Sequence, residues 1–533
     1  MPSRLVVCWW LGLSLLAGAA HGYTLPTGFR VDTLATGLAT PCAFDFLPAD
    51  RVLYTEQNTG RVRLYRAGTG VQSTPVVQVA GVVTGGERGL LGLAIDPAFP
   101  LKPYLYLFHS AAGGRSAIVR VTLTGDLDGT GGGDLLELSG ARMNLMTTIP
   151  DNAPNHNGGT LRFGADGTLI ASLGDDAFPC GAQDSTGLRG VLLRLRTSAL
   201  PVGVANASIG ALTPPDNPYA TSPDSNARLV LARGLRNPFR VQTDVSSGVL
   251  VIGDVGESAR EELDLLVLPG RVTTLPGIAL PGANFGWPYR EGSVVGSHAG
   301  ECPPTPSGLA APAYDYDRTA QQGGASIIPF GFYWSLFDVG AFDWGAAYSG
   351  NLLFTDYLGG ALVRLVPSTR GTGSPWVPAP LVPGQPNSAH FGEGFTEISD
   401  GRQGPDGALW FVRQAHGFAA NTGLLARIVP AVQNPDPRPV APLSMRLFAS
   451  PAVGSAILLL ESGFSAPASV TLHDASGRVL RRIADPEFRR TTSGVGVFWD
   501  GHDDDGVAVR PGIYWARLES GGRTASVRVP LLR

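Results

Sequence analysis

The sequence predicts an all-β protein that consists of a six-bladed β-propeller followed by a small β-sandwich. Its 533 residues include 71 glycines and 43 prolines, and its β-branched and aromatic residues gather in short segments between turns. A unit of two strands recurs six times along the chain, and the pattern changes after Pro430. A chain of this length accommodates two or three domains.

Each repeated unit has a short apolar strand, a polar or glycine-rich loop, and a second strand that carries arginine or acid. The first strands are Val52–Glu56, Tyr104–Phe108, Leu169–Leu173, Val249–Gly253, Leu352–Asp356 and Leu409–Arg413, and their partners begin at Gly60, Ala117, Gly190, Glu261, Gly360 and Gly423. Two strands cannot bury both of their faces, so such units stack radially as propeller blades. Six units therefore predict six blades over residues 23–430. A sandwich or a solenoid fits the irregular spacing less well, because propeller loops tolerate insertions.

After Pro430 the repeated strand pair no longer occurs, and the composition of the sequence changes. Residues 431–441 form a proline-rich connector, and alternating strands over residues 442–533 predict a small sandwich. Its motifs Asp474-Ala475-Ser476-Gly477, Trp499-Asp500-Gly501 and Gly512-Ile513-Tyr514 resemble the Ig-like domain of flagellar hook-capping proteins. We expect this module to act as a tether or spacer.

The N-terminus indicates export from the cytoplasm. Arg4 precedes an apolar run, Leu5–Leu16, which small residues follow, so residues 1–22 are typical of a signal peptide. This predicts a secreted or periplasmic protein. No other apolar run is long enough to cross a bilayer, and a net charge of −4 offers no electrostatic footprint for nucleic acid.

Three cysteines remain after removal of this segment, namely Cys42, Cys180 and Cys302. An oxidising compartment permits one disulfide. The preferred pair is Cys180–Cys302, which leaves one free thiol.

The segment from Pro154 to Asp176 contains the main candidate for catalysis. His156 precedes two glycines and a short strand, and Asp175 follows the next strand after the turn Ala165-Asp166-Gly167. A hairpin of this length returns the chain to its starting end, so His156 and Asp175 are expected side by side. A histidine held by a carboxylate can act as an oriented general base. The alternative is a surface histidine near two turn aspartates.

Residues 25–430 resemble the soluble glucose and sorbosone dehydrogenases. These six-bladed propellers use pyrroloquinoline quinone (PQQ) and calcium to oxidise aldose sugars. The matching motifs follow the family's order: Gly86-Glu87-Arg88-Gly89-Leu90-Leu91-Gly92, His156-Asn157-Gly158-Gly159, Leu173-Gly174-Asp175, Ala182-Gln183-Asp184, Gly234-Leu235-Arg236-Asn237-Pro238, Gly253-Asp254-Val255-Gly256, Glu261-Glu262-Leu263-Asp264 and Gly282-Ala283-Asn284-Phe285-Gly286-Trp287-Pro288.

The resemblance implies a role for each matching residue. The general base falls on His156, its orienting acid on Asp175, and the groups beside the quinone oxygens on Arg236 and Asn237. The oxygen ligands expected for calcium fall on four residues: the carbonyls of Gly256 and Glu257 for the ion at the cofactor, and Glu262 with the carbonyl of Phe285 for a structural ion. Glu87 falls on a substrate-side amide position.

Three departures affect the cofactor site. PQQ carries three carboxylates, yet the family's cofactor lysine falls on Leu358 and two of its arginines fall on Glu397 and Ser399. Arg364, Arg402 and Arg413 are the candidates to replace the lost charges.

Two functions follow from these observations. The first is PQQ- and calcium-dependent oxidation of an aldose at C1, with a small sugar and an external electron acceptor as partners. The second is a non-catalytic secreted propeller that binds carbohydrate or a protein partner.

Overall fold

Strands dominate the described part of the chain, as the sequence predicted. The computed structural model describes residues 22–532 except 199, 319–324, 336–341, 370–373, 432–443, 448–451, 454–455, 463–467, 485–488, 492–493 and 521–522. The short helical segments are α1 (Ile209–Leu212), η1 (Pro179–Gln183), η2 (Ala227–Leu229) and η4 (Ala346–Tyr348). The predicted signal segment lies outside the described residues, apart from Gly22.

Within these described residues, the first 430 positions form six sheets, each with a core of four strands, and neighbouring core strands are antiparallel except β18 and β19, which are parallel. The first sheet contains β2 (Pro41–Leu47), β3 (Arg51–Glu56), β4 (Arg61–Arg66) and β5 (Gly70–Val71), with β6 (Val77–Gln78) beside β4. The second contains β7 (Leu90–Ile95), β8 (Tyr104–Ala111), β9 (Arg115–Gly125) and β10 (Leu135–Glu137), with β11 (Met143–Pro150) beside β9. The third contains β12 (Leu161–Phe163), β13 (Leu169–Leu173), β14 (Val191–Leu195) and β15 (Val230–Arg233).

The other three sheets continue the series. The fourth contains β16 (Arg240–Asp244), β17 (Val249–Asp254), β18 (Arg260–Val267) and β19 (Ile278–Ala279), with β22 (Tyr314–Asp317) beside β18. The fifth contains β23 (Ile327–Tyr333), β24 (Asn351–Asp356), β25 (Leu362–Pro367) and β26 (Trp376–Pro378). The sixth contains β27 (Ile398–Gln403), β28 (Leu409–Arg413), β29 (Gly423–Pro430) and β1 (Phe29–Leu38). A small hairpin of β20 (Arg290–Glu291) and β21 (Val294–Val295) lies beside the fourth sheet.

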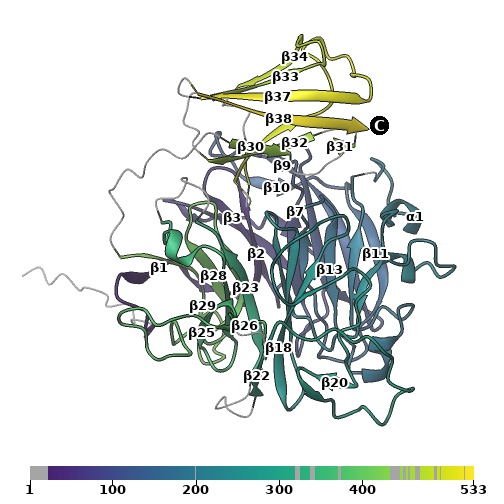
Figure 1. The fold of residues 1–533 in the computed structure, drawn as a ribbon, viewed down its shortest axis with the longest axis vertical. Coiled ribbons are helices and arrows are strands. Elements are labelled where there is room, and N and C mark those ends of the chain that lie inside the picture. The colour runs from purple at the N-terminus through teal and green to yellow at the C-terminus, as the bar shows by residue number, and fades with distance from the viewer. Residues whose placement is uncertain are drawn as a thin grey trace, which may run out of the picture.

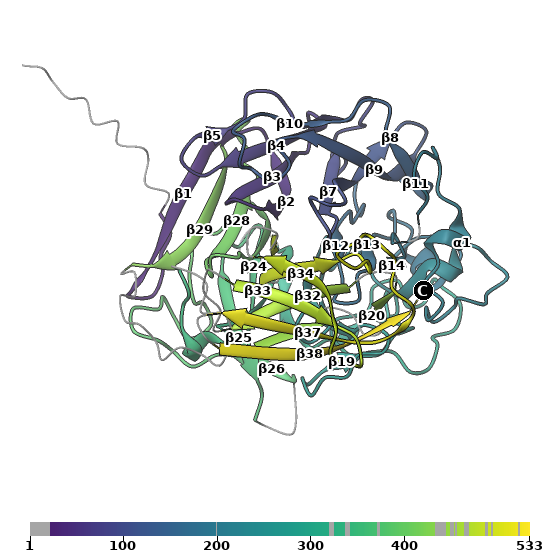
Figure 2. The same cartoon turned by 90° about the horizontal axis from the view of Figure 1, so that it is seen from above.

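The six sheets form a ring. Their first strands contact one another in the cyclic order β2, β7, β12, β16, β23 and β27, and β27 contacts β2 again. An apolar cluster fills the space between each pair of neighbouring sheets. Figure 2 shows the sheets arranged around a common centre. This is the arrangement of a β-propeller, in which each sheet buries both faces against its neighbours.

The N-terminal strand closes the ring. β1 pairs antiparallel with β29, from Phe29 opposite Pro430 to Leu38 opposite Gly423, so the sixth sheet contains both ends of the region. The two strands run side by side in Figures 1 and 2. This pairing satisfies backbone groups that an open ring would expose at its two ends.

Every predicted strand pair forms the second and third strands of one sheet. Of the first strands, only β12 was expected, as the short strand that follows the two glycines after His156. Of the missed first strands, β2, β16 and β27 are interrupted by polar or charged residues such as Asp45, Gln242 and Asp400, whereas β7 and β23 have no charged residue and were missed for another reason. Charges in place of apolar residues hide the periodicity that identifies a strand.

The C-terminal part folds into two further sheets that share a core. One contains β30 (Ser444–Leu447), β32 (Ala456–Ser462), β36 (Gly494–Trp499) and β35 (Arg489–Thr491), and the other β31 (Ala452–Val453), β38 (Arg523–Leu532), β37 (Gly512–Ser520), β33 (Ala468–His473) and β34 (Val479–Ala484). Buried residues of both sheets, including Leu458, Trp499, Val470 and Leu518, form one apolar cluster. The predicted sandwich is therefore present, whereas its Ig-like kinship stays a prediction.

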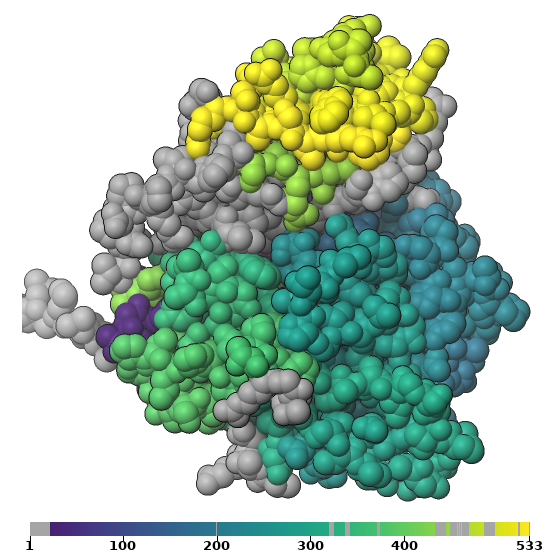
Figure 3. All heavy atoms as spheres, viewed as in Figure 1, coloured from purple at the N-terminus to yellow at the C-terminus, as the bar shows by residue number. Residues whose placement is uncertain are grey.

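The sandwich lies over one end of the ring, as Figures 1 and 3 show. Arg446 donates a hydrogen bond of 3.2 Å to the carbonyl of Val245, in the turn between β16 and β17. That turn is at the opposite end of the fourth sheet from Asp254, which ends β17. Most of the predicted connector is outside the described residues. No helix in the described ranges is long and apolar enough to cross a membrane.

Candidate active site

The short hairpin of β12 and β13 brings His156 and Asp175 together. Leu161 pairs with Ala171 in this hairpin, so the residues before β12 and after β13 share one end of the ring. The Nδ1 atom of His156 lies 2.7 Å from Oδ1 of Asp175, whose side chain is fully buried. A proton on Nδ1 is the arrangement that satisfies both groups, and it leaves Nε2 as a lone-pair acceptor.

The backbone around this pair is held in unusual conformations. His156, Asp176 and Ala177 all have positive φ values, of 59°, 57° and 51°. The turn also packs tightly, because a Cβ atom on Gly174 would lie 2.0 Å from the carbonyl oxygen of His156. Non-glycine residues adopt this region at a cost, and such outliers gather at functional sites.

Trp287 fixes the other oxygen of Asp175. Its indole Nε1 donates to Oδ2 at 2.8 Å, and the backbone N–H of Ala177 donates to Oδ1 at 2.9 Å. The sequence placed Trp287 in a family motif but gave it no role. Its contact orients the carboxylate, which in turn orients His156.

Glu87 and Asn237 hold the backbone of the histidine. Oε2 of Glu87 accepts from the N–H of His156 at 2.8 Å and from Nδ2 of Asn237 at 3.0 Å. Oδ1 of Asn237 accepts from the N–H of Gly158 at 3.1 Å. The two residues therefore link the loop before β7, the loop before β12 and the loop before β16.

Asp254 anchors the predicted cofactor residues. Its carboxylate accepts the backbone N–H groups of Arg236 at 2.8 Å and Asn237 at 2.7 Å. Burial raises the pKa of Asp254 to about 7, although these two hydrogen bonds act in the opposite direction.

Arg236 is positioned but not fully satisfied. Its Nη1 donates to the carbonyl of Val255 at 3.0 Å, and its guanidinium carbon lies 5.5 Å from the ring centre of Trp287. Its buried Nε has no hydrogen-bond partner among the described residues. A buried donor without a partner is costly, so this site fits an anionic or carbonyl-bearing ligand.

The loop that carries Gly256 and Glu257 wraps around a buried acid. Oε1 of Glu291 accepts the backbone N–H groups of Glu257, Ser258, Ala259 and Arg260, at 2.7 to 3.1 Å. The carboxylate of Glu257 bonds to Ser297 and to His298, the latter at 3.1 Å. Burial acts to raise the pKa of Glu257, but these bonds outweigh it and leave the pKa lowered.

The carbonyl of Gly256 already has a cationic partner. Nη1 of Arg318 donates to it at 2.9 Å and also forms an ion pair with Glu261. The sequence had given no role to Arg318 or Glu261.

The predicted structural calcium position is acidic and deeply buried. Glu262 pairs in register with Asp254 of β17 and with Asp315 of β22. Both carboxylate oxygens of Asp264 are buried without a partner among the described residues. Burial, Asp264 and Asp254 raise the pKa of Glu262 well above its usual range. Oxygen donors that lack a partner suit a hard cation, although no cluster of three or more His, Cys, Asp or Glu side chains spaced to hold a metal occurs in the described ranges.

The positions of the missing cations hold no positive charge. Leu358 is half-buried in the turn after β24, and Ser399 donates its hydroxyl to the carbonyl of Pro41 at 2.9 Å. Glu397 is buried with a φ of 59°, and its Oε2 has no partner in the described part of the chain.

Among the three candidate replacements, Arg364 and Arg402 each leave only Nε without a partner among the described residues, whereas Arg413 leaves both Nε and Nη2. Arg364 is bonded to Asn351 and to the carbonyl of Pro380, and Arg402 is bonded to Asp45 and Phe44. Arg413 ends β28 and is almost fully buried, and its Nε and Nη2 bond to no described residue. Its surroundings therefore fit a negatively charged ligand.

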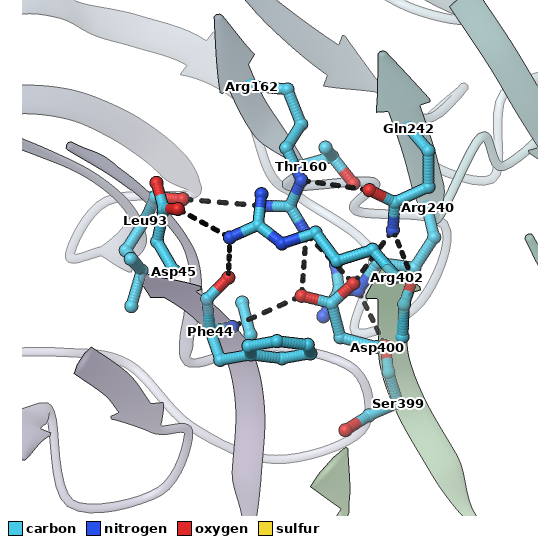
Figure 4. A network of polar contacts seen from close by, with 12 residues as sticks. Phe44, Asp45, Leu93, Thr160, Arg162, Arg240, Gln242, Ser399, Asp400 and Arg402 are labelled. Atoms are coloured by element: carbon cyan, nitrogen blue, oxygen red, sulfur yellow. Dashed lines mark hydrogen bonds and ion pairs between the residues drawn. The ribbon is translucent and has the colours of Figure 1, made fainter. Parts of the chain in front are cut away.

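A charged network fills the middle of the ring below these loops (Figure 4). Nη2 of Arg162 in β12 donates to both carboxylate oxygens of Asp400 in β27, at 2.8 and 2.6 Å. Nε2 of Gln242 in β16 donates to the same carboxylate at 3.0 Å. Arg240 of β16 and Arg402 of β27 also lie near this carboxylate and act on it electrostatically. Burial acts to raise the pKa of Asp400, but the three arginines outweigh it and hold the pKa below its usual range.

The predicted disulfide is present. Cys180 and Cys302 are bonded, with their Cα atoms 5.4 Å apart, and Cys42 is a buried free thiol. Cys180 belongs to η1, where Gln183 donates to the side chain of Asn284 at 3.1 Å. The disulfide therefore ties η1 to the loop after β21, while Gln183 links η1 to the loop that carries Trp287.

Known proteins resemble this chain over most of the propeller. Residues 38–330, more than half of the chain, match the family model described as Glucose / Sorbosone dehydrogenase. Aldose sugar dehydrogenase YliI of Escherichia coli (strain K12) is 26% identical over 266 residues, which are 50% of this chain and 63% of that protein. The chain thus spans less than two thirds of the length of this relative.

Solved structures share the fold. The apo form of the soluble aldose sugar dehydrogenase (Asd) from Escherichia coli is 22% identical, with a TM-score of 0.55 over 75% of this chain and 99% of that one. The PQQ-bound form of aldose sugar dehydrogenase from Streptomyces coelicolor is 23% identical, with a TM-score of 0.51 over 76% of this chain and 99% of that one. With the family model matching more than half of its length, the chain belongs to the glucose/sorbosone dehydrogenase family.

Proposed function

We propose that this protein oxidises an aldose sugar at C1 with PQQ as its cofactor. The observation that carries the proposal is the hydrogen bond of 2.7 Å between His156 and the buried Asp175, beside Arg236 and Asn237. The alternative was a surface histidine near two turn aspartates. Against it, a buried tryptophan, Trp287, fixes the carboxylate of Asp175. The sugar and an external electron acceptor are the proposed partners.

His156 is the proposed general base. Asp175 keeps the proton of the ring on Nδ1, so Nε2 is available to take the proton of the sugar's C1 hydroxyl. As that proton leaves, hydride departs from C1 and the sugar becomes a lactone. Asp175 also stabilises the imidazolium that forms.

Bound PQQ supplies the acceptor for this hydride. Arg236 and Asn237 are the residues proposed to hold its quinone oxygens, and Arg413 is proposed to face one of its carboxylates. The unsatisfied N–H groups of Arg236 and Arg413 support this assignment. The guanidinium of Arg236 would place positive charge beside these oxygens. Glu87 is proposed to lie on the substrate side while it holds the backbone of His156.

A structural calcium is proposed at Glu262 and the carbonyl of Phe285. The unsatisfied carboxylate of Asp264 beside Glu262 supports a cation there.

The proposed place of action is the periplasm or the exterior of the cell, because the N-terminal segment has the pattern of a signal peptide. The disulfide between Cys180 and Cys302 is consistent with an oxidising compartment.

A non-catalytic propeller is the second candidate. The unpartnered carboxylate oxygen of Glu397, at a position expected to carry a cation, favours it. This acid opposes the binding of a cofactor with three carboxylates.

Titration of the purified mature protein with PQQ separates the two candidates. The expected result is a saturable change in the quinone absorption band, followed by reduction of an artificial dye when aldoses are added. Protein that neither binds PQQ nor oxidises any aldose, in calcium or in chelator, would contradict the enzyme proposal.

A further inference from the structure

Two consecutive carbonyls in the loop after β17 are each bonded to a guanidinium. Val255 accepts from Nη1 of Arg236 at 3.0 Å, and Gly256 accepts from Nη1 of Arg318 at 2.9 Å. Arg318 follows β22, which pairs with β18 of the same sheet. The loop therefore presents its carbonyl oxygens to fixed positive charges.

Arg318 and Glu261 together hold both polar backbone groups of Gly256. Glu261 is fully buried, and its Oε1 accepts the N–H of Gly256 at 3.2 Å while it pairs with Arg318. Its Oε2 accepts the N–H of Ile327 at 2.9 Å. The carboxylate is thus neutralised by the guanidinium that caps the neighbouring carbonyl.

A calcium ion does not fit beside this carbonyl. Calcium requires six to eight oxygen ligands at about 2.3–2.6 Å. The oxygen of Gly256 is already bonded to a cation, and two positive charges on one carbonyl repel each other. The nearby carboxylates already have partners as well: Glu261 forms an ion pair with Arg318, and Glu257 is hydrogen-bonded to Ser297 and His298.

We propose that Arg318 supplies, at the carbonyl of Gly256, the positive charge that the family resemblance assigns to calcium. The cofactor loop therefore takes no calcium, and this protein binds PQQ without it. The inference deepens the proposed function and rests on it for the part that concerns PQQ.

The first test measures the dissociation constant of PQQ by absorbance titration in calcium and in chelator, at a temperature where the protein stays folded. The wild type is expected to give the same value in both, whereas Arg318→Ala loses affinity by roughly tenfold to hundredfold in chelator. Calcium should restore most of that loss, because Glu261 and the Gly256 carbonyl become free to bind it. Wild-type binding that is more than about tenfold weaker in chelator overturns the inference.

The second test needs no PQQ. Arg318→Ala leaves the carboxylate of Glu261 buried and unpaired, so calcium is expected to raise its melting temperature by several degrees more than it raises that of the wild type. The double variant Arg318→Ala/Glu261→Gln should lose this extra response. Arg271→Ala is the matched control, because Arg271 donates to the carbonyl of Ala165 at 2.8 Å, in the turn at the other end of the third sheet.

The two tests separate the two proposals. Wild-type protein that binds no PQQ in either condition, while Arg318→Ala gains the calcium response, supports the role of Arg318 at the loop and refutes the enzyme proposal. Equal calcium responses in Arg318→Ala, Arg271→Ala and the wild type refute the role of Arg318, whatever the outcome with PQQ.

Discussion

The indole N–H of Trp287 donates to the buried carboxylate of Asp175 at 2.8 Å, across 112 positions of sequence. The same ring lies beneath the guanidinium of Arg236. One side chain therefore connects the proposed base, through Asp175, to the proposed cofactor arginine. Neither partner of Trp287 lies in its own loop, so the geometry of the site depends on the packing of two sheets.

Replacing Trp287 by phenylalanine tests this connection. Trp287→Phe keeps a ring beneath Arg236 but removes the hydrogen bond to Asp175, which is worth roughly 1.5–3 kcal/mol when the acceptor is charged. We expect kcat in the dye-linked assay to fall by about tenfold or more with a small change in KM. Trp376→Phe is the matched control, because that buried indole donates to the carbonyl of Pro276, in the loop before β19. Equal loss of kcat in both variants would contradict the role of Trp287.

Removal of the proposed base should abolish oxidation without unfolding the protein. His156→Ala is expected to lower kcat by roughly 10²–10⁴-fold, the usual contribution of a general base. Asp175→Asn should also lower kcat, because an amide no longer selects the proton on Nδ1. Melting curves report whether the fold is retained, and His473→Ala in the sandwich serves as the control. Activity of His156→Ala near that of the wild type would show that another group takes the proton.

The pKa of Asp254 predicts a dependence of stability on pH. The folded protein holds this proton up to about pH 7, whereas an unfolded aspartate releases it near pH 4. The stabilising contribution is therefore complete below about pH 4 and is lost as the pH rises to 7, with an upper limit on the order of 4 kcal/mol. Asp254→Asn removes this titration, so its stability relative to the wild type should improve between pH 5 and pH 8. Denaturant unfolding at both pH values measures the difference, and an equal difference at both would contradict the prediction.

The charged network in the ring is expected to contribute to stability. Arg162→Met removes two bonds from Asp400, which is fully buried, and the unfolding free energy should fall by about 3–5 kcal/mol. Arg517→Met breaks a surface pair with Glu519 in which each side chain is 49% exposed, and it should cost about 0–1 kcal/mol. Urea unfolding compares the two variants. Equal losses would show that the network contributes no more than a surface ion pair.

Local patterns in the sequence predicted the parts of the site that depend on short-range folding. His156 and Asp175 are joined by one hairpin, so turn residues and strand length sufficed to place them together. The second and third strands of each sheet recur six times as a pair, and this repetition identified them. The odd number of thiols predicted one free cysteine, and the preferred pair, Cys180 with Cys302, is the one that forms.

The rest of the site depends on contacts that the sequence pattern does not encode. Arg162 and Asp400 are 238 positions apart and lie in two different sheets, so no local pattern relates them. Arg318 stands outside every family motif and meets Gly256 only because β22 pairs with β18. The contact between Arg162 and Asp400 forms only when the six sheets are assembled into the ring, so no single segment of the sequence predicts it.

Restoring a cation at Leu358 should tighten the binding of PQQ. Leu358 is half-buried in the turn after β24, where its N–H donates to Asp356 at 2.9 Å, so a longer side chain can be added without breaking this bond. Leu358→Lys adds one charged donor at the end of the ring that holds Asp175 and Asp254, and we expect the dissociation constant of PQQ to fall by about tenfold. Leu381→Lys adds the same charge at an exposed position after β26 and should leave the dissociation constant unchanged. Equal tightening in both variants would show a general effect of net charge, and no tightening in either would mean that Leu358 does not face the cofactor.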